Sequence, residues 1–374
     1  MKIIHLVLGK ANPERMNGVN KVVYNLAKSQ VYSGHNVTLW GIANTELVNY
    51  GKRPFKTVLF KNMRKQFSID SKLDIEIAKL PADSIFHIHG GFIIEFYFLI
   101  KKIKERGYKV IFTPHGSYNK EALKKNRLIK FFYLRTIEKF LLRKVDVIHS
   151  VGESEQDSII DIFPSLKDKC VLIPNGCELK KKINIIRSSN DILSFSYCGR
   201  LRMYTKGLDI LIEGFSKYIQ EYDSRTMLHI IGDGEDGDKL KSMVKEFNLT
   251  ENVIFHGSKF GIEKDRIISN SDFFIHSSRY EGLPTGVLEA SSLNIPCIVS
   301  KPTNMAKYIR YYESGLVIEE NTSEGIYAEM IKASVIKYSN KLSNYSENTS
   351  KMVNDKFRWS KVSKELVRVY SSVA

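Results

Sequence analysis

The chain has 374 residues, of which 43% are hydrophobic and 26% are charged. This ordinary globular composition excludes intrinsic disorder, collagen-like repeats and a small disulfide scaffold, and at roughly 150 residues per domain the length predicts two domains. Lysine and arginine outnumber aspartate and glutamate by 57 to 41, and the excess suits either a solubilising surface or a polyanionic partner such as nucleic acid, anionic lipid or a phosphorylated substrate.

The first half of the chain alternates predicted strands with helices, beginning with an apolar strand over residues 2–8. This opening stretch is too short for a signal peptide, no segment reads as a transmembrane helix, and the four cysteines are scattered, so we expect a cytoplasmic protein. The further elements expected here are a helix over 19–33, strands over 35–42, 84–89 and 109–113, a long helix over 123–144, and strands over 145–151 and 170–174.

A basic, polar stretch over residues 178–191 is the expected linker between the two domains. The same alternation then restarts, with strands over 192–198, 226–232, 253–256, 272–277 and 296–300 separated by helices over 207–221, 237–247, 264–269 and 285–293. Repeated strand–helix units with few hairpin turns predict parallel sheets covered by helices on both faces. The fold class is therefore α/β, with two Rossmann-like domains.

The segment EGLPTGVLE follows a predicted strand, where doubly wound sheets bind their ligands. Pro284 suits the first turn of the next helix, so the amides near Thr285 and Gly286 point out of the helix N-terminus towards a phosphate. Glu289, one turn further, is placed to accept hydrogen bonds from two ribose hydroxyls, and Glu281 is placed to meet whatever the phosphates carry. Two solvated glutamates are the alternative, but the loop's position at a strand end favours a site.

A second segment, GRLRMYTKG, also joins a predicted strand to a helix. Arg200 can bind phosphate with two parallel hydrogen bonds, and Lys206 adds a mobile point charge. Gly199 and Gly207 allow a ligand to approach the loop closely. Arg202 lies further along the loop and is the weaker candidate.

Together these segments resemble the retaining glycosyltransferases of family 4: EGLPTGVLE is similar to their E-x7-E motif, and GRLRMYTKG to their phosphate-binding Arg…Lys loop. Other segments resemble the family in the family's order, with Asn17-Gly18 in place of its usual Gly-Gly pair: NGVNKVVYNLA, TPHGS, IPNG, IIGDG and VIFHGS. The resemblance implies a GT-B fold, with two parallel sheets facing each other across a cleft that holds a nucleotide-sugar. It implies an acceptor domain over 1–178, a donor domain over 190–355, and a C-terminal helix over about 357–374 that packs on the first domain.

The resemblance also implies a role for each matching residue. Arg200 and Lys206 would hold the diphosphate, Glu289 the ribose, and Glu281 and His115 would face the transferred sugar. The full catalytic set is then His115, Glu281, Arg200 and Lys206, and the donor-binding set is Gly18, Gly199, Arg200, Lys206, Leu283, Thr285, Gly286 and Glu289. No metal or other cofactor is expected, because these cations can stabilise the departing diphosphate; front-face attack and a covalent intermediate both remain open.

The expected reaction moves a sugar from a UDP- or GDP-linked donor to a glycan or polyprenyl-linked acceptor, in bacterial cell-surface polysaccharide biosynthesis. Rival readings are an NAD-dependent oxidoreductase built on GDGEDG (232–237), a basic nucleic-acid-binding protein, and, more weakly, a nucleotide-sugar epimerase. The acidic residues of GDGEDG oppose a pyrophosphate, and no RNA-binding motif is present. His87 and His89 alternate at a strand end, where structural histidines are favoured over a metal pair.

The segment 120–144 carries nine basic residues interleaved with aromatic and aliphatic ones. Such segments suit an anionic membrane surface, so we expect peripheral association with the inner face of the cell membrane. The basic residues expected to make the contact are Lys124, Lys125, Arg127 and Lys130, beside Phe131, Phe132 and Tyr133.

Overall fold

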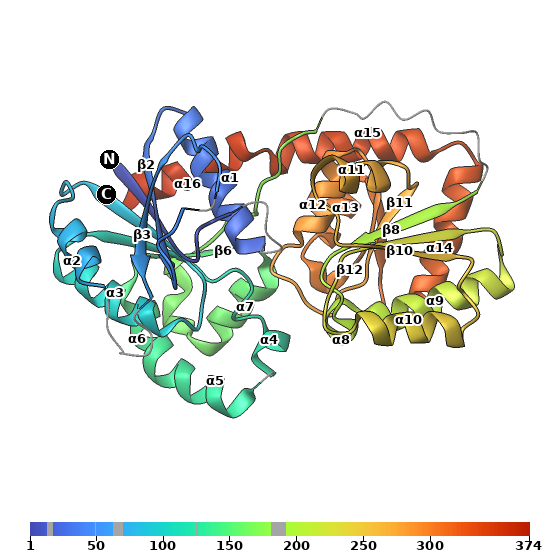
Figure 1. Cartoon of the computed structure of the whole chain (residues 1–374), viewed down its shortest axis with the longest axis horizontal. Coiled ribbons are helices and arrows are strands. Elements are labelled where there is room, and N and C mark those ends of the chain that lie inside the picture. The colour runs from blue at the N-terminus through green and yellow to red at the C-terminus, as the bar shows by residue number, and fades with distance from the viewer. Residues whose placement is uncertain (13–17, 49, 63–69, 125, 181–191) are drawn as a thin grey trace. The chain divides into compact units, whose positions relative to one another are not determined.

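The computed structural model describes residues 1–12, 18–48, 50–62, 70–124, 126–180 and 192–374. It consists of unit 1, Met1–Gly176 with Trp359–Ala374, and unit 2, Cys177–Arg358. Each unit contains one parallel sheet with helices on both sides (Figure 1), which confirms the predicted α/β class with two Rossmann-like domains. Residues 178–180 of the expected linker belong to unit 2, and its remainder, 181–191, lies outside the described residues.

The sheet of unit 1 has the order β3-β2-β1-β4-β5-β6-β7, with every neighbouring pair parallel. Its strands are nearly continuous apolar runs because helices cover both faces. The order reverses between β1 and β4. The strands are β1 (Lys2–Leu8), β2 (Asn36–Ala43), β3 (Lys56–Lys61), β4 (Ser84–His89), β5 (Lys109–Thr113), β6 (Val147–Ser150) and β7 (Cys170–Leu172).

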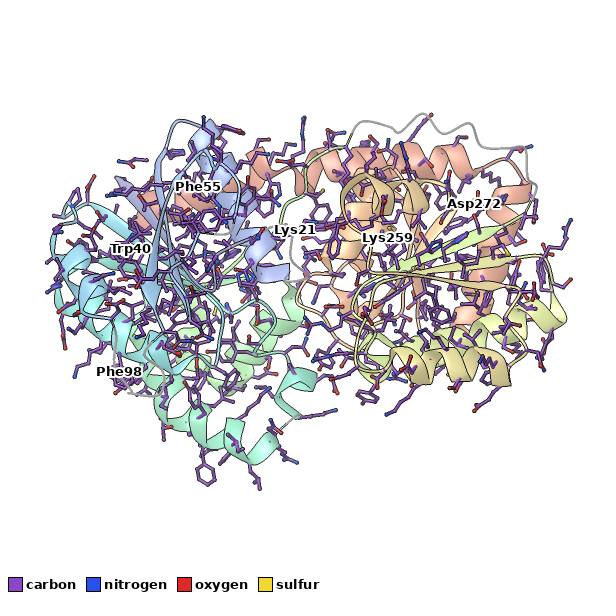
Figure 2. The ribbon with its side chains drawn as sticks, viewed as in Figure 1. Lys21, Trp40, Phe55, Phe98, Lys259 and Asp272 are labelled. Carbon is purple, nitrogen blue, oxygen red and sulfur yellow. The ribbon has the colours of Figure 1, made fainter. Side chains whose placement is uncertain are left out.

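Two apolar cores lie on opposite faces of this sheet. On one face lies Trp40, which is labelled in Figure 2. Its ring meets those of Phe60 and Phe86 edge-on, with ring centroids 5.2 and 5.5 Å away. On the other face, α1 and α16 lie side by side and bury a second cluster that includes Val23 and Leu366. The helices of unit 1 are α1 (Gly18–Tyr32), α2 (Ser71–Ala78), α3 (Ile94–Glu105), α4 (Lys120–Lys124), α5 (Arg127–Tyr133), the π-helical turn η2 (Leu134–Glu138), α6 (Lys139–Lys144), α7 (Glu153–Ile162), the 3-10 turn η3 (Pro164–Lys169) and α16 (Trp359–Val373).

The single long helix predicted over 123–144 is wrong. The chain turns at Asn126, whose φ of 56° lies in the left-handed region, so α4 ends before it and α5 begins after it. Asparagine tolerates this conformation better than most residues. A π-helical turn, η2, then separates α5 from α6.

The sheet of unit 2 has the order β10-β9-β8-β11-β12-β13, also parallel throughout. Its order reverses between β8 and β11. The strands are β8 (Ser194–Cys198), β9 (Met227–Ile231), β10 (Val253–Gly257), β11 (Phe273–His276), β12 (Cys297–Ser300) and β13 (Gly315–Ile318). The helices are α8 (Met203–Lys206), α9 (Leu208–Glu221), α10 (Gly237–Glu246), α11 (Gly261–Ser269), α12 (Thr285–Ser292), η4 (Lys301–Thr303), α13 (Ala306–Tyr312), α14 (Ser323–Tyr338), α15 (Leu342–Met352) and η5 (Val353–Phe357).

Candidate functional site

The predicted loops of unit 2 leave its sheet at the point where the strand order reverses. The Arg200–Lys206 loop follows β8 and the Glu281 loop follows β11, and these two strands are neighbours. Loops that leave neighbouring strands on either side of a reversal form the usual ligand crevice of a doubly wound sheet. The topology therefore brings the two sequence segments to one place.

Glycine at position 207 allows the two loops to touch. Gly207 has a φ of +62°, and a Cβ there would lie 2.1 Å from the carbonyl oxygen of Ser277, so no other residue fits without moving the backbone. The Ser277 hydroxyl donates to the carbonyl oxygens of Lys206 and Gly207 at 3.2 and 2.9 Å. This contact fixes the end of α8 against the loop that carries Glu281.

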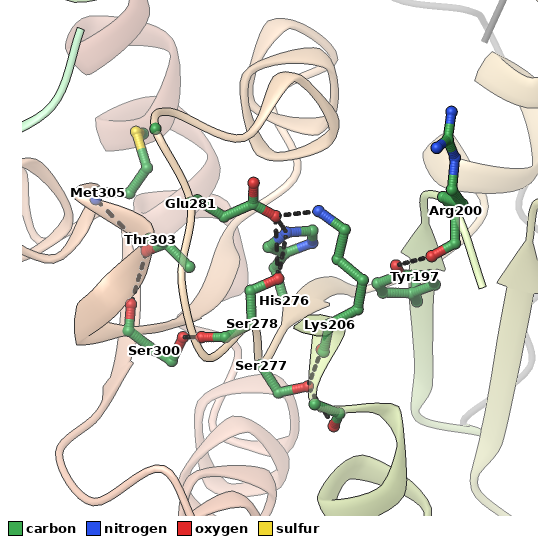
Figure 3. A network of polar contacts seen from close by, with 12 residues as sticks. Tyr197, Arg200, Lys206, His276, Ser277, Ser278, Glu281, Ser300, Thr303 and Met305 are labelled. Carbon is green, nitrogen blue, oxygen red and sulfur yellow. Dashed lines mark hydrogen bonds and ion pairs between the residues drawn. The ribbon is translucent and has the colours of Figure 1, made fainter. Parts of the chain in front are cut away.

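Lys206 and Glu281 form an ion pair at the centre of this arrangement (Figure 3). The same carboxylate oxygen lies 3.0 Å from Nε2 of His276 and accepts a hydrogen bond of 3.0 Å from the Ser278 hydroxyl. Asn304 donates its side-chain amide to the Glu281 carbonyl oxygen at 2.9 Å, which holds the loop itself. Glu281, which is predicted to face the sugar, and Lys206, which is predicted to face the diphosphate, thus belong to one polar cluster.

The charge state of this cluster follows from its surroundings. Burial would raise the pKa of Glu281, but the positive charge of Lys206 and the hydrogen bond from His276 outweigh it and lower the pKa to about 2. Burial lowers the pKa of His276, despite the opposing effect of Glu281. At neutral pH the cluster therefore holds a carboxylate beside a neutral imidazole, so Glu281 is suited to charge stabilisation and not to donating a proton.

The GDGEDG segment (232–237) follows β9, the neighbour of β8, and packs against the Arg200 loop. A Cβ at Gly232 would lie 1.9 Å from the Gly199 carbonyl oxygen, and the Asp236 carboxylate accepts a 2.9 Å hydrogen bond from the amide of Met203, the first residue of α8. The motif is therefore packed against the Arg200 loop. The Arg200 carbonyl oxygen accepts a 3.2 Å hydrogen bond from the Tyr197 hydroxyl (Figure 3).

Glu289 projects from α12 and forms an ion pair with Lys264 on α11. Both side chains are about nine-tenths buried, with 13% and 10% exposed. Burial opposes the charge of Lys264, but Glu289 raises the pKa of that lysine above its usual value. The predicted ribose ligand is therefore a carboxylate held in place by a cation.

The start of α12 lies close to the end of β8. A Cβ at Gly286 would lie 2.7 Å from the carbonyl oxygen of Cys198, so glycine is needed for the helix N-terminus to approach the Arg200 loop. Thr285 is the first residue of α12, and Leu283 before it is buried.

The remaining predicted residues, Gly18 and His115, belong to unit 1. Gly18 begins α1, and His115 follows β5 with a φ of 56°, an unusual backbone conformation for a non-glycine residue. The loop after His115 is held by Glu155, whose carboxylate accepts a 3.2 Å hydrogen bond from the Tyr118 amide. Burial raises the pKa of Glu155 to about 7, although backbone amides oppose the shift.

His87 and His89 lie beside His5, and one nitrogen from each ring is within 4.8 Å of the others. All six ring nitrogens already have side-chain partners in the described residues, which include Gln30 and Tyr370. The three rings are thus part of a hydrogen-bonded network and need no metal to satisfy them.

Solved structures of similar fold cover nearly the whole chain. Anabaena HepE in complex with UDP and glucose matches with a TM-score of 0.77 and 14% identity, over 100% of both chains. WaaG, a glycosyltransferase involved in lipopolysaccharide biosynthesis, matches with a TM-score of 0.73 and 14% identity, over 98% of this chain and 99% of WaaG. These likenesses confirm the GT-B fold.

Two family profiles match consecutive parts of the sequence. The one described as Glycosyltransferase Family 4 matches residues 16–181, and the one described as Glycosyl transferases group 1 matches residues 178–352. The chain is a GT-B glycosyltransferase. The oxidoreductase, nucleic-acid-binding and epimerase readings find no support.

Curated relatives of this glycosyltransferase are distant in sequence. An uncharacterized glycosyltransferase of Methanocaldococcus jannaschii is 27% identical over 73% of this chain and 70% of its own length. The UDP-Gal:alpha-D-GlcNAc-diphosphoundecaprenol alpha-1,3-galactosyltransferase of Escherichia coli is 25% identical over 66% of this chain and 64% of its own length. An uncharacterized 41.2 kDa protein in the cps region of Klebsiella pneumoniae is 24% identical over 85% and 87%.

Three residues that contact the candidate site were missed by sequence reasoning: His276, Asn304 and Lys264. His276 is the last residue but one of the strand predicted over 272–277 and the last residue of β11, so its position near a strand's carboxyl end was a usable signal. Lys264 and Asn304 reach the site from other helices and loops, and only tertiary packing brings them there.

Proposed function

We propose that the chain is a retaining, metal-independent glycosyltransferase that moves a sugar from a nucleotide-sugar to a glycan or lipid-linked acceptor. The observation that carries the proposal is the joining of two loops at the sheet's reversal point, with Lys206 paired to Glu281. The Arg200–Lys206 loop supplies positive charges that can bind a diphosphate. The loop that carries Glu281 places a carboxylate beside them.

Each residue has a role that its surroundings allow. Arg200 and Lys206 bind the diphosphate and stabilise the charge that develops when the sugar leaves. Glu289, oriented by its ion pair with Lys264, accepts hydrogen bonds from the ribose. Glu281 stays ionised and lies near the transferred sugar, where it stabilises positive charge at the reacting carbon.

The donor and acceptor classes are supported by the relatives. The Escherichia coli relative is named for a UDP-linked donor and a diphosphoundecaprenol acceptor, and HepE has been solved with UDP and glucose. A UDP-linked sugar, with a GDP-linked one second, is therefore the proposed donor class, and a polyprenyl-linked acceptor in bacterial cell-surface polysaccharide biosynthesis is the proposed setting.

A donor panel tests this function directly. We expect UDP or GDP, and one of their sugar derivatives, to raise the melting temperature by several degrees at saturating concentration, because a ligand at 100 times its Kd stabilises by about 2.7 kcal/mol. Transfer with the stabilising donor should keep the donor's anomeric configuration by NMR and continue in EDTA. Inversion of configuration, loss of activity in EDTA, or no stabilisation by any nucleotide would contradict the proposal.

We also propose that α5 contacts an anionic membrane. Four of its apolar side chains face solvent, with Leu128 75%, Ile129 71%, Phe132 67% and Phe131 45% exposed. The helix begins with Arg127 and contains Lys130. None of the helices in the described segments has the length and hydropathy needed to cross a bilayer. Exposed apolar groups among basic ones match the interface of an anionic leaflet, where each lysine or arginine contributes about 1 kcal/mol.

The structure changes which residues we expect to make this contact. Lys124 pairs with Glu121, and Lys130 donates to the Ala122 carbonyl oxygen at 2.5 Å, so part of the predicted basic cluster bonds locally. Lys125 lies outside the described residues. The apolar side chains of α5 are the more exposed part of this surface.

Co-sedimentation with vesicles separates these contributions. We expect Leu128→Ser/Ile129→Ser/Phe132→Ser and Lys124→Glu/Lys125→Glu/Arg127→Glu/Lys130→Glu each to reduce binding to anionic vesicles, and added salt to weaken wild-type binding because charge attraction is screened over roughly 10 Å at 0.1 M. Tyr311→Ser, which changes an apolar side chain of unit 2 that is 80% exposed, is the control and should bind normally. Equal sedimentation of all variants, or no preference for anionic lipid, would rule the surface out.

A further inference from the structure

A polar layer lies inside unit 1, on the face of the sheet that α1 and α16 cover. His5 on β1, His87 and His89 on β4, and His149 on β6 are all at most 3% exposed. They share this face with apolar residues two positions away, such as Ile3, Ile85 and Val147, because side chains on one face of a strand recur every second residue. Buried imidazoles need hydrogen-bond partners on both nitrogens.

These partners form one continuous path through the unit. It runs from the His115 ring to His89, His5 and Gln30, and then through Tyr370, His87, Thr113 and His149 to the carbonyl oxygen of Ile173. We call this path the histidine chain. Its successive distances are 3.1, 3.0, 2.7, 3.3, 2.6, 2.6, 2.7 and 2.7 Å.

The rings of the histidine chain are neutral. Burial lowers the pKa of His5 and His149 to about 4 and that of His115 to about 3, and it lowers the pKa values of His87 and His89 well below the ordinary value. A neutral imidazole has one donor and one acceptor nitrogen. A ring that accepts a hydrogen bond at one nitrogen must therefore donate from the other, so all hydrogen bonds along the histidine chain run in the same direction.

The Ile173 end sets that direction. A carbonyl oxygen can only accept, so Nε2 of His149 carries the proton and Nδ1 accepts from the Thr113 hydroxyl. That hydroxyl oxygen must then accept from Nε2–H of His87. Nδ1 of His87 accepts in turn from the Tyr370 hydroxyl, and the Tyr370 oxygen accepts from the Gln30 amide.

The same direction continues from Gln30 to the protein's predicted sugar-facing histidine. The Gln30 carbonyl oxygen accepts from Nε2–H of His5, whose Nδ1 accepts from Nε2–H of His89. Nδ1 of His89 is then an acceptor, so Nε2 of His115 must donate to it. All five histidines consequently carry their proton on Nε2.

We propose that His89 is a positioning residue that fixes His115 as its Nε2–H tautomer, so that Nδ1 of His115 is an obligatory hydrogen-bond acceptor for a substrate hydroxyl. Among the described residues, no hydrogen bond from the protein reaches this Nδ1. The substrate part of the inference rests on the proposed function, in which His115 faces the sugar. The chemistry that this atom recognises is an O–H group and not a carboxylate or carbonyl oxygen.

Nitrogen NMR of histidine-labelled protein measures the tautomer without any turnover. In long-range ¹H–¹⁵N spectra at pH 7, we expect His115 to show a protonated Nε2 and a bare Nδ1, with the signal identified by its loss in His115→Ala. In His89→Phe, His115 loses its acceptor and should gain a population protonated on Nδ1. The kcat for transfer should then fall on the order of 10-fold or more, as misplaced catalytic groups typically cause, while the Kd of the nucleoside diphosphate stays unchanged.

Two further variants separate positioning from general damage to the fold. His89→Gln keeps a side-chain amide that can donate to His5 and accept from His115, so it should restore most of the wild-type tautomer and kcat. His229→Phe breaks a similar 3.1 Å histidine–histidine hydrogen bond, to His256 in unit 2, and should change neither quantity.

The outcomes that overturn the inference are distinct. A His115 signal in wild type that is imidazolium or protonated on Nδ1 overturns the assigned direction of the histidine chain. An unchanged His115 tautomer in His89→Phe overturns the positioning role. Full kcat in His115→Ala would show that His115 makes no contact with the substrate, so the role that the proposed function gives it would fail. The NMR spectra report on the tautomer independently of that result.

Discussion

Replacing Lys206 with alanine is expected to lower kcat about 100-fold or more, and Arg200→Ala should have an effect of the same order, because in the proposed site each removes a donor aimed at charge that develops in the transition state. For Lys206 the structure adds a second effect. Its charge is a main cause of the low pKa of Glu281, so the variant leaves a buried carboxylate with less support.

The measurement is steady-state transfer as a function of pH. The pKa of Glu281 should rise when Lys206 is removed, so the acid limb of the residual activity should move to higher pH. Arg202→Ala is the matched control, because Arg202 lies in the same loop but pairs with Glu235 at 3.1 Å. Near-normal kcat in Arg200→Ala or Lys206→Ala, with folding verified by melting, would remove these residues from the diphosphate site, as would an equal loss in Arg202→Ala.

Glutamine at position 281 should slow transfer about 100-fold with little change in binding of the nucleoside diphosphate, since it removes a charge that acts beside the sugar. Glutamine at position 289 should instead weaken that binding about 10- to 100-fold, because hydrogen bonds to a charged group contribute about 1.5–3 kcal/mol each. Calorimetry with the diphosphate and single-turnover transfer measure the two effects separately.

Lys264 complicates the second variant and also provides its control. Removing the charge of Glu289 leaves Lys264 buried beside a neutral amide, and a broken buried ion pair costs about 3–5 kcal/mol. The double variant Lys264→Met/Glu289→Gln removes that penalty and should melt closer to wild type while still binding the diphosphate weakly. If Glu281→Gln weakens diphosphate binding more than Glu289→Gln does, the two roles are exchanged.

Strong local patterns made most of the fold predictable. The strands over 2–8 and 84–89 are apolar runs bounded by loops, and the structure forms them with the same bounds. The strand β3 (Lys56–Lys61) was missed because it is an edge strand with lysine at both ends, which dilutes its apolar signal. The helix over 123–144 was extended too far because one left-handed residue, Asn126, leaves little trace in a helical periodicity.

The part of the site that lies in loops directly after strands was predictable, because such loops can be located from the sequence. Lys206 and Glu281 come from such loops, and the structure brings them together. The ion pair of Glu289 with Lys264 and the path behind His115 depend on how helices pack across the sheets, which spacing along the chain does not encode. The roles of these residues in catalysis and donor binding stay predictions that the variants above examine.

The placement of α16 has a consequence for the order in which the protein is made. Trp359, Val362, Leu366 and Tyr370 of this helix complete an apolar core whose other members come from α1 and the strands of unit 1. The ribosome synthesises all of unit 2 before it reaches them. At 5–20 residues per second, unit 1 waits roughly 10–40 s for its last helix. The second unit along the chain is therefore expected to finish folding first, while the nascent first unit holds a partly uncovered sheet face beside α1 that chaperones can bind.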